Sequence, residues 1–580
     1  MKHVITNAAE ITVLEVIDNT YKTGGGPVSV GGTVVVASKG PVGKIVQVLD
    51  ANRESIFGKP LPKKAYGMEG LRHLADATAK CNYVNVVRVV AQDAKFPTLA
   101  FKLFNVKGAW TARTSYSIDD VVTVTGGKLI CKTAHTSTST APTYATPGAE
   151  WDKFTTPVVA SAVSYGTSVA VADGFWLAFY PIDGDPSGSR VVRILDVNET
   201  TLEDGSKSGR FTLGVYDKND MGSEYLLESF EVGISPDDVD DMGLPAFIET
   251  VFENESNYFR CDFNDTVTWA QLKPVLDSLK TTTSTPQSFA FTGGTNGGEP
   301  TVEDWNKAWE LLRDERIPVN LLFAAGCYEE EVLSKIADIA DDRHISAFAD
   351  VPPGLKSAAA IAWQKAIGIK SRHLRWYYSP YSATDQWRGG KTVWGVSGAA
   401  VAAKAVCNSI FTGNVPGIHY APAGAKRGVL SRTGIVMLYP DDRINRDDLY
   451  DARINPIVPL TEGGAMIDDD MTAHYQQNYT RFGWVNDILD YIDHRFLEAA
   501  SYAKFEPDGL TYAILYDLTK EILDQLVTSG ALVKPRKAED GTKEYVITIK
   551  QLEIDLWHVQ WDICPTGSAR RIAGQPRLIK

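Results

Sequence analysis

Long apolar runs and paired cysteines are both missing from this sequence of 580 residues. No stretch of about eighteen consecutive apolar residues occurs, so we expect no membrane-spanning helix. The N-terminus also lacks the sustained apolar segment of a signal peptide. The 6 cysteines are scattered, without a CxxC pair or matching histidines, which favours core thiols in a reducing compartment over a metal or redox site. We therefore expect a soluble protein that is made in the cytoplasm and does not insert into a membrane.

Basic residues are fewer than acidic ones, since 58 Lys and Arg against 72 Asp and Glu give a net charge of −14. This deficit disfavours nucleic acid as a partner, because phosphate binding depends on clustered Lys and Arg. The last eleven residues carry +4, from Arg570, Arg571, Arg577 and Lys580, and subtracting +4 from −14 leaves −18 for residues 1–569. A basic tail on an acidic body predicts that the tail docks on an acidic surface, which another copy of the chain could provide.

Familiar catalytic motifs are also missing. The 9 histidines are isolated, with no HExxH. The turn 38–43 lacks GxGxxG, the glycine-rich loop 292–298 lacks the Gly-Lys-Ser/Thr ending of a phosphate site, and residues 395–398 lack the second glycine of a GxSxG elbow. The acidic run 468–470 could hold a cation, although adjacent acids are more often a solvated loop. We predict no catalytic residue, no metal site and no cofactor.

What the sequence does contain is an alternation of strand and helix patterns. Apolar β-branched runs predict strands, and apolar residues at helical spacing predict helices. Thr301 and Asp304 have the spacing of a capping box, which marks a helix start. The strands expected from these patterns lie at 33–37, 83–90, 191–195, 210–216, 318–325, 344–350 and 374–381, and the helices at 71–79, 329–340 and 355–369.

Two strongly amphipathic helices are predicted within 485–529, with Gly530 just past the second. This segment holds nine acids against three bases, so it presents either an ordinary solvated face or an acidic surface to a partner. Further on, the apolar residues occupy even-numbered positions in 552–556 and odd-numbered positions in 557–563. Because side chains of a strand alternate between its two faces, this change predicts a bulge or bend.

The run from His419 to Gly464 contains no pattern of catalytic or ligand-binding residues, but its sequence motifs are distinctive. "APAGAKRG" followed by "DDLYDARINPIV" closely resembles the tail sheath proteins of contractile-tailed bacteriophages. "VASKGPVGKIVQV" at 36–48, "FTGGTNGG" at 291–298 and "FEPDG" at 505–509 also resemble segments of that family, in the same order. The resemblance implies that 454–458 is a strand of the assembly core.

The resemblance covers residues 32–100, 175–300 and 316–580. It has one departure: residues 465–478 read AMIDDDMTAHYQQN, where many relatives carry WGaRT, and this leaves the strand contacts there open.

Residues 105–155 differ from their surroundings because Ser and Thr dominate them. The pattern resembles small carbohydrate-binding modules of the chitin-binding type, with Trp110, Tyr116 and Trp151 on the family's aromatic positions. The resemblance implies that these rings stack on a sugar, whereas a second reading makes them the core of a tiny domain. Asp119 stands where that family has glycine, which leaves the turn before Asp120 open.

Together these features predict an α/β and α+β multidomain fold, with a sheath-type core of mixed sheets flanked by helices, inserted β-rich outer domains, and extended N- and C-terminal arms. The expected divisions are an N-terminal arm (1–26), a first sheath segment (27–104), an inserted β module (105–155), a β-rich domain (156–285), an α/β domain (286–395), an assembly core with acidic helices (396–564) and a basic C-terminal arm (565–580).

The resemblance implies a structural, non-enzymatic subunit of a contractile phage tail sheath in the virion, assembled in the host cytoplasm. Copies would stack as rings around the tail tube protein, with baseplate and tail terminator proteins as further partners, and contract to drive the tube through the host envelope for genome delivery. Arms would add strands to neighbouring copies. The candidate residues of these arms are Ile11, Val13, Val16, Arg570, Arg571, Arg577 and Lys580.

A second hypothesis is that the acidic helices face the tube, through Asp517, Glu521 and Asp524. Two alternatives to the phage tail stay open. One is the sheath of a pyocin-like or cellular contractile injection system. The other is a carbohydrate-active enzyme with a glycan-binding module at 105–155, which would need two carboxylates in a cleft.

Overall fold

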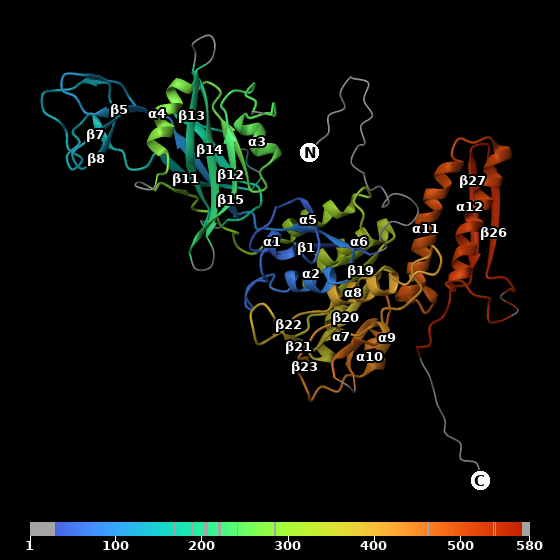
Figure 1. The fold of residues 1–580 in the computed structure, drawn as a ribbon. Helices are drawn as coiled ribbons and strands as arrows, with labels where there is room; N and C mark the ends of the chain where they lie inside the picture. The colour runs from blue at the N-terminus through green and yellow to red at the C-terminus, as the bar shows by residue number, and fades with distance from the viewer. Residues whose placement is uncertain are drawn as a thin grey trace.

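The computed structural model describes residues 29–570, except for residues 166, 168, 187–188, 202–206, 219–221, 241, 283–285, 461–462, 538 and 540. Figure 1 shows an α/β body with a β-rich body and a small β module beyond it on one side, and a helix–hairpin unit on the other. No helix among the described residues is long and apolar enough to cross a membrane.

An eight-stranded sheet forms the centre of the α/β body, in the order β2-β3-β1-β18-β19-β20-β24-β25. The six inner strands run parallel, and the edge strands β2 and β25 are antiparallel to their neighbours. Inner strands of such a sheet are covered on both faces, which explains their continuous apolar runs. The strands are β1 (Val30–Val35), β2 (Ile45–Val48), β3 (Tyr83–Arg88), β18 (Leu321–Phe323), β19 (Ser346–Asp350), β20 (Leu374–Tyr378), β24 (Ile454–Pro459) and β25 (Ala465–Ile467).

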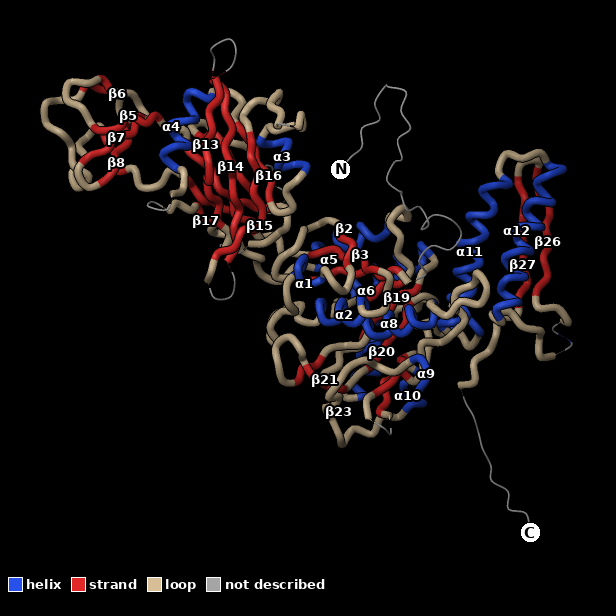
Figure 2. Tube along the Cα trace, in the orientation of Figure 1, coloured by secondary structure: helices blue, strands red, loops and turns tan. Residues whose placement is uncertain are grey.

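Helices cover both faces of this sheet (Figure 2). On one face α2 (Gly70–Thr78) and α8 (Ser397–Asn408) share a core with β1, β3, β18 and β19. On the other, α5 (Val302–Glu310), α6 (Glu330–Arg343) and α7 (Ser357–Ile367) pack around Trp309 and Trp376. The predicted capping box is confirmed, because Asp304 accepts from the Thr301 N–H and Thr301 accepts from the Asp304 N–H.

Shorter elements complete this body. They are α1 (Arg53–Phe57), η1 (Leu311–Arg313), α9 (Gly424–Arg427), α10 (Arg446–Asp451), η2 (Tyr479–Arg481) and a three-stranded sheet of β21 (Tyr381–Thr384), β22 (Lys391–Val393) and β23 (Val436–Met437). In the run 419–464, α10 leads into β24, which pairs with β20 as a strand of the central sheet.

The β-rich body packs two four-stranded sheets around one aromatic core, in the orders β11-β4-β12-β16 and β15-β14-β13-β17. Trp176 and Phe179 of the first sheet share this core with Phe211 and Leu213 of the second. The elements are β4 (Lys95–Lys102), β11 (Val158–Ser164), β12 (Phe175–Pro181), β13 (Val191–Thr201), β14 (Lys207–Lys218), β15 (Glu224–Val232), α3 (Ile248–Asn254), β16 (Phe259–Phe263), α4 (Trp269–Leu279) and β17 (Phe289–Ala290).

The small module is inserted between two paired strands of this body. β4 and β11 are antiparallel neighbours, and the Lys102 N–H donates to the Pro157 carbonyl at 3.0 Å. The module therefore leaves and re-enters the sheet at one point. It holds β5 (Asn105–Ala109), β6 (Ser115–Tyr116), β7 (Asp120–Val124), β8 (Gly127–Cys131), β9 (His135–Thr136) and β10 (Trp151–Lys153).

The helix–hairpin unit consists of α12 (Asp508–Ser529), β26 (Tyr545–Glu553), β27 (Leu556–Ile563) and the second half of α11 (Gly483–Ala503). Gly530 lies just past α12 with φ 80°, as predicted. The parity change at 552–557 falls at the turn between the antiparallel strands β26 and β27, and the pairing shifts register between Gln551 and Glu553 beside it. The expected bulge or bend is therefore a hairpin turn with a register shift next to it.

Candidate assembly surfaces and a buried ionic junction

A buried ionic junction joins the central sheet to α11. The Arg375 guanidinium on β20 lies 2.6 Å from Asp487 of α11 and 3.2 Å from Asp470. Lys404 Nζ, from α8, lies 2.6 Å from the second oxygen of Asp487, and Ser346 Oγ donates to Asp487 at 2.6 Å. Burial opposes ionisation of Asp487, but Arg375 and Lys404 outweigh it and hold its pKa below the ordinary value. The junction fixes the first turns of α11 against the sheet.

Each aspartate of the run 468–470 pairs with a different arginine. Asp468 binds Arg446 at 3.1 Å, Asp469 accepts from Nε of Arg570 at 2.7 Å, and Asp470 faces Arg375. The expectation of a solvated acidic loop or a cation site is therefore wrong. The run joins α10, the core and the C-terminal segment.

The described end of the chain docks on its own body. The Arg570 guanidinium lies 5.0 Å from the ring of Tyr450 and 5.1 Å from that of Phe482, in addition to its pair with Asp469. Just before it, the Thr566 N–H donates to the Ala531 carbonyl at 2.8 Å. Arg570 is thus engaged with its own chain in this structure, and its expected contact with a neighbouring copy stays a prediction. The other arm candidates, Ile11, Val13, Val16, Arg571, Arg577 and Lys580, lie outside the described residues.

The three candidate tube-facing acids lie together beside one groove of α12. Asp517, Glu521 and Asp524 line it with Lys520 and with residues 412–415. Asp524 is not free, because Lys520 Nζ and the Tyr545 hydroxyl each donate to it at 2.5 Å and hold its pKa below the ordinary value. Glu521 accepts from Gln525 of the same helix at 3.1 Å and has no cation paired with it among the described residues, so Asp517 and Glu521 are the acids of this set that we expect to meet a partner.

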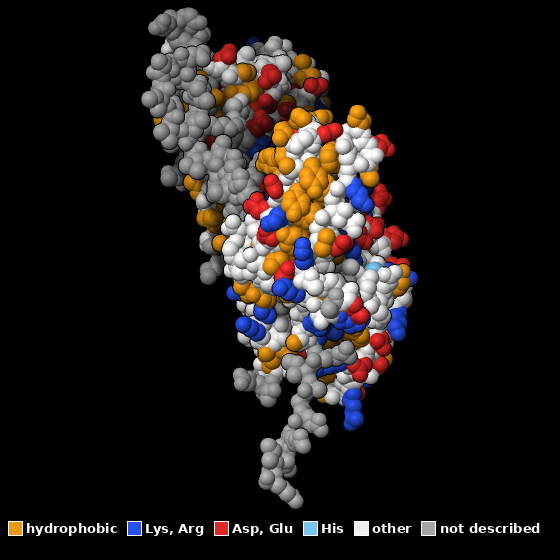
Figure 3. All heavy atoms as spheres, turned by 90° about the vertical axis from the view of Figure 1, so that its right-hand side faces the viewer, with side chains coloured by type: hydrophobic (Ala, Val, Ile, Leu, Met, Phe, Trp, Pro, Cys, Tyr) orange, Lys and Arg blue, Asp and Glu red, His pale blue; other side chains and the backbone are white. Residues whose placement is uncertain are grey.

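The helix–hairpin unit exposes an unusual amount of apolar surface. Phe505 is 95% exposed and Ile554 is 88% exposed. Figure 3, which views this end of the molecule, shows hydrophobic side chains gathered along the unit. Within the described residues, β26 and β27 pair only with each other, so both outer edges of the hairpin are open to another strand. The other exposed apolar residues of the unit are Leu497, Tyr502, Leu510, Tyr512, Tyr516, Val546, Leu552 and Leu556.

In the inserted module the aromatic residues form the core. Tyr116 and Trp151 are 4% and 3% exposed, with ring centroids 5.0 Å apart, and half-buried Trp110 packs against them. A ring that stacks on a sugar needs a free face, so the stacking role expected for Tyr116 and Trp151 does not fit. Asp119 has φ 67°, the left-handed conformation that a glycine there would adopt, so this departure preserves the turn.

A serine and a histidine also meet in the core. Ser397 Oγ lies 3.2 Å from His73 Nδ1, and Asp350 lies 3.8 Å from His73 Nε2. Both Ser397 and His73 are 0% exposed. The Asp350 carboxylate accepts the N–H groups of Val396 and Ser397, so it caps the first turn of α8. Because no substrate can reach the hydroxyl, this cluster is structural.

Sequence reasoning missed the junction residues Arg375, Lys404 and Asp487. The sequence signal for such a junction is a charged residue within a segment that is otherwise expected to be buried. Arg375 interrupts the strand LRWYY, Lys404 lies in the Ala-rich helix α8, and Asp487 lies in the first turn of α11, which is buried on all sides. What could not be read was which of them meet, because they are separated by up to 112 residues.

No family model matches the chain. The tail sheath protein of Vibrio phage KVP40 is 23% identical over 343 residues, which cover 52% of this chain and 46% of that protein. The chain thus spans about half the length of the curated relative it matches.

Two solved structures are similar over almost the whole chain. The sheath tail protein of Listeria innocua has a TM-score of 0.51 at 12% identity, covering 95% of this chain and 94% of that one. The sheath tail protein of Desulfitobacterium hafniense has a TM-score of 0.46 at 11% identity, covering 92% and 96%. On the Listeria likeness, this chain has the fold of the sheath tail proteins.

Proposed function

We propose that this chain is a structural, non-enzymatic sheath subunit of a contractile tail or injection system, which polymerises in stacked rings around a tail tube. The observation that carries the proposal is the sheath tail protein fold over 95% of the chain. The sequence similarity to a phage tail sheath protein supports it independently.

Strand addition at the β26–β27 hairpin would join neighbouring copies. The hairpin has open edges and lies among exposed apolar side chains such as Phe505 and Ile554. Main-chain hydrogen bonds to an added strand give affinity, and the apolar side chains give the burial that isolated hairpins lack. We propose that residues 1–28 and 571–580 of other copies supply the strands. Arg570 would anchor the start of the outgoing tail on its own body.

Electron microscopy of the purified protein tests this proposal. The full chain should form helical tubes, whereas variants that lack residues 571–580 or 1–28 should stay folded but unassembled. A variant with Arg571, Arg577 and Lys580 all changed to Gln keeps the tail length and removes the charge. If strand pairing dominates, this variant still assembles; if charge docking dominates, it does not. Normal tubes from both deletions would refute the role of the arms.

We propose that Asp517 and Glu521 face the tube. Reversal of both charges to Lys should abolish docking on tube protein without preventing folding, because neither side chain binds a group that the fold depends on. The matched control reverses the exposed Asp237 and Asp265 of the β-rich body, and it should dock normally. Normal docking of D517K/E521K in a co-sedimentation assay with purified tubes would count against this orientation.

We propose a phage tail, with baseplate and tail terminator proteins as further partners, and the sequence similarity to a phage protein supports this version. A contractile injection device is the alternative. Immunogold labelling of lysates distinguishes them. Gold along tails that carry DNA-filled heads supports the phage version, and gold on headless particles supports the device.

For the inserted module we propose a structural role on the outside of the sheath. Any sugar stacking would rest on Trp110, since Tyr116 and Trp151 are buried. Equal retention of the wild type and of Trp110→Ala on chitin beads would argue against glycan binding through this ring.

A further inference from the structure

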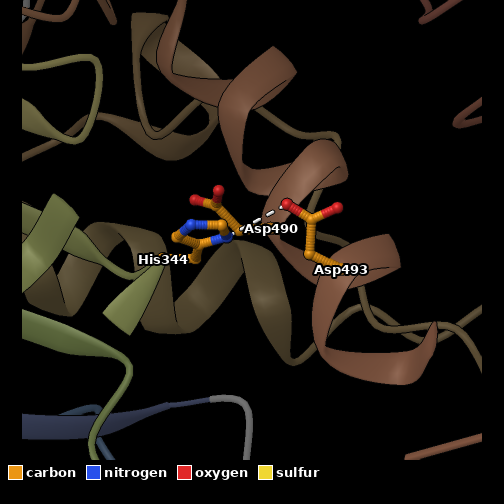
Figure 4. Close-up of side chains that lie close together, drawn as sticks. All are labelled: His344, Asp490 and Asp493. Atoms are coloured by element: carbon orange, nitrogen blue, oxygen red, sulfur yellow. Dashed lines mark hydrogen bonds and ion pairs between the residues drawn. The ribbon is translucent and has the colours of Figure 1, made fainter. Parts of the chain in front are cut away.

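Two histidines and three aspartates gather where the end of α6 and the start of β20 meet α11. His344 is the residue after α6, and Asp490 and Asp493 lie one turn apart on α11. One ligand atom from each of these three residues lies within 4.8 Å of the other two. Figure 4 shows both carboxylates beside the His344 ring.

Asp490 is the residue of this cluster that points to a ligand, because one of its carboxylate oxygens is buried without a partner among the described residues. It is 6% exposed, and its Oδ1 lies 3.0 Å from His373 Nε2 and 3.7 Å from the Arg372 guanidinium. Its second oxygen, Oδ2, is buried and has no hydrogen-bond partner among the described residues. A buried carboxylate oxygen without a partner is costly, and such a group needs an explanation. A bound cation would satisfy it.

The other two side chains leave the cluster open to solvent. The His344 and Asp493 side chains are 44% and 28% exposed, and His344 Nδ1 lies 3.1 Å from Asp493 Oδ2. An ion could therefore enter from solvent, replace this contact and keep water as a further ligand.

A second layer of contacts orients Asp490. His373 Nδ1 lies 2.6 Å from Asp341, which also accepts from Ser371 Oγ at 2.6 Å. Chains of this kind fix ligand carboxylates in metal sites. Through them, Oδ1 of Asp490 is held in place, while Oδ2 has no hydrogen-bond partner among the described residues.

We propose that His344, Asp490 and Asp493 form a binding site for a divalent transition metal of the zinc type. One imidazole and two carboxylates suit Zn²⁺, whereas Mg²⁺ and Ca²⁺ prefer oxygen ligands alone. Ligand distances of about 2.0–2.2 Å place ligand atoms roughly 3.5 Å apart, so small side-chain rotations close the site. The ion would tie α11, and with it the helix–hairpin unit, to the end of α6.

The test uses the purified full chain, stripped with a chelator and titrated with Zn²⁺ by calorimetry. We expect one Zn²⁺ per chain, no binding of Mg²⁺ or Ca²⁺, a higher thermal midpoint with Zn²⁺, and a Co²⁺ absorption band in the visible. His344→Asn and Asp493→Asn should each weaken Zn²⁺ binding at least tenfold. His344 has the left-handed backbone (φ 50°, ψ 55°), which Asn also tolerates, so His344→Asn should fold.

The matched control is His558→Asn, which removes an exposed histidine of β27 and should bind as the wild type does. Absence of stoichiometric Zn²⁺ binding by the wild type would overturn the proposal. So would unchanged binding in both His344→Asn and Asp493→Asn, because the ion would then bind elsewhere.

Discussion

Arg375 lies in a strand position where any large apolar residue would fit the local pattern, yet its guanidinium meets two carboxylates and lies 5.0 Å from the ring of Phe348. Arg375 and Asp470 are 1% exposed. Buried charges of this kind add little net stability when paired, but removal of one partner leaves another buried and uncompensated. The junction therefore makes α11 sensitive to single substitutions.

Arg375→Met should destabilise the unassembled chain by about 3–5 kcal/mol, because Asp470 loses its cation and Asp487 keeps only Lys404. The measurement is the shift of the denaturant midpoint. Arg446→Ala, which breaks the more exposed pair with Asp468, should cost at most about 1 kcal/mol. Equal effects of the two substitutions would contradict the role of burial.

The lowered pKa of His419 predicts that the stability of the fold depends on pH. Burial, followed by Lys404 and Arg427, lowers its pKa to about 4. A histidine with a lowered folded pKa stabilises the fold above the unfolded value of about 6.5, and this contribution is lost as the pH falls towards 4.

His419→Gln should therefore lose less stability than the wild type between pH 6.5 and 4, by up to about 1.4 kcal/mol per pH unit. Thermal unfolding at a series of pH values measures the difference between the two proteins, so that carboxylates common to both cancel. The exposed His558→Gln serves as the comparison and should follow the wild type.

At the scale of elements, α12 is defined by its two ends. Pro507 precedes its first residue, and Gly530 ends it with φ 80°, where the Gly530 N–H donates to carbonyls of the last turn. Nothing lies within 4 Å of a Cβ added at Gly530, so a substitution there tests backbone conformation alone.

Gly530→Ala should lower stability by about 1 kcal/mol, because alanine disfavours the left-handed region. Gly509→Ala is the matched control, since Gly509 lies in the first turn of the same helix and a Cβ added there also meets nothing within 4 Å. It should be neutral or stabilising. A thermal midpoint of Gly530→Ala equal to that of the wild type would contradict a conformational role of the glycine.

At the scale of the whole molecule, the central sheet draws strands from three segments that are distant in sequence, 30–88, 321–378 and 454–467. The chain enters and leaves the inserted module at a single point of its host, between β4 and β11, and Val121 of β7 packs into the core of the β-rich body. Removal of the module should therefore leave the rest of the chain able to fold.

Replacement of residues 105–153 by a short Gly-Ser linker should give a folded chain that still assembles. The expected loss is about 2 kcal/mol, because Phe104 is 2% exposed and packs against Phe154 and the module. Thermal unfolding and negative-stain images measure the two outcomes. An aggregated product would show that the module is needed to complete the β-rich body.

The local elements could be predicted because their causes are local. The helix over 71–79, the capping box at Thr301 and Asp304, the stop at Gly530 and the short strands of the α/β stretch all follow from spacing and turn chemistry. The parity change near residue 556 indicated a bulge or bend but not a return of the chain as a second strand, because a hairpin turn and a bulge disturb the alternation in the same way.

The sequence by itself determined several of the helices and strands, how acidic the protein is, and, through its resemblance, which fold to expect. Only the tertiary structure decided that three adjacent aspartates bind three arginines, that Tyr116 and Trp151 are core residues, and that His344 meets Asp490 and Asp493. The physical reason is range. Backbone conformation depends on residues a few positions apart, whereas ion pairs and burial depend on residues that the fold brings together from 22 positions away, as for Arg446 and Asp468, to 149 positions away, as for His344 and Asp493.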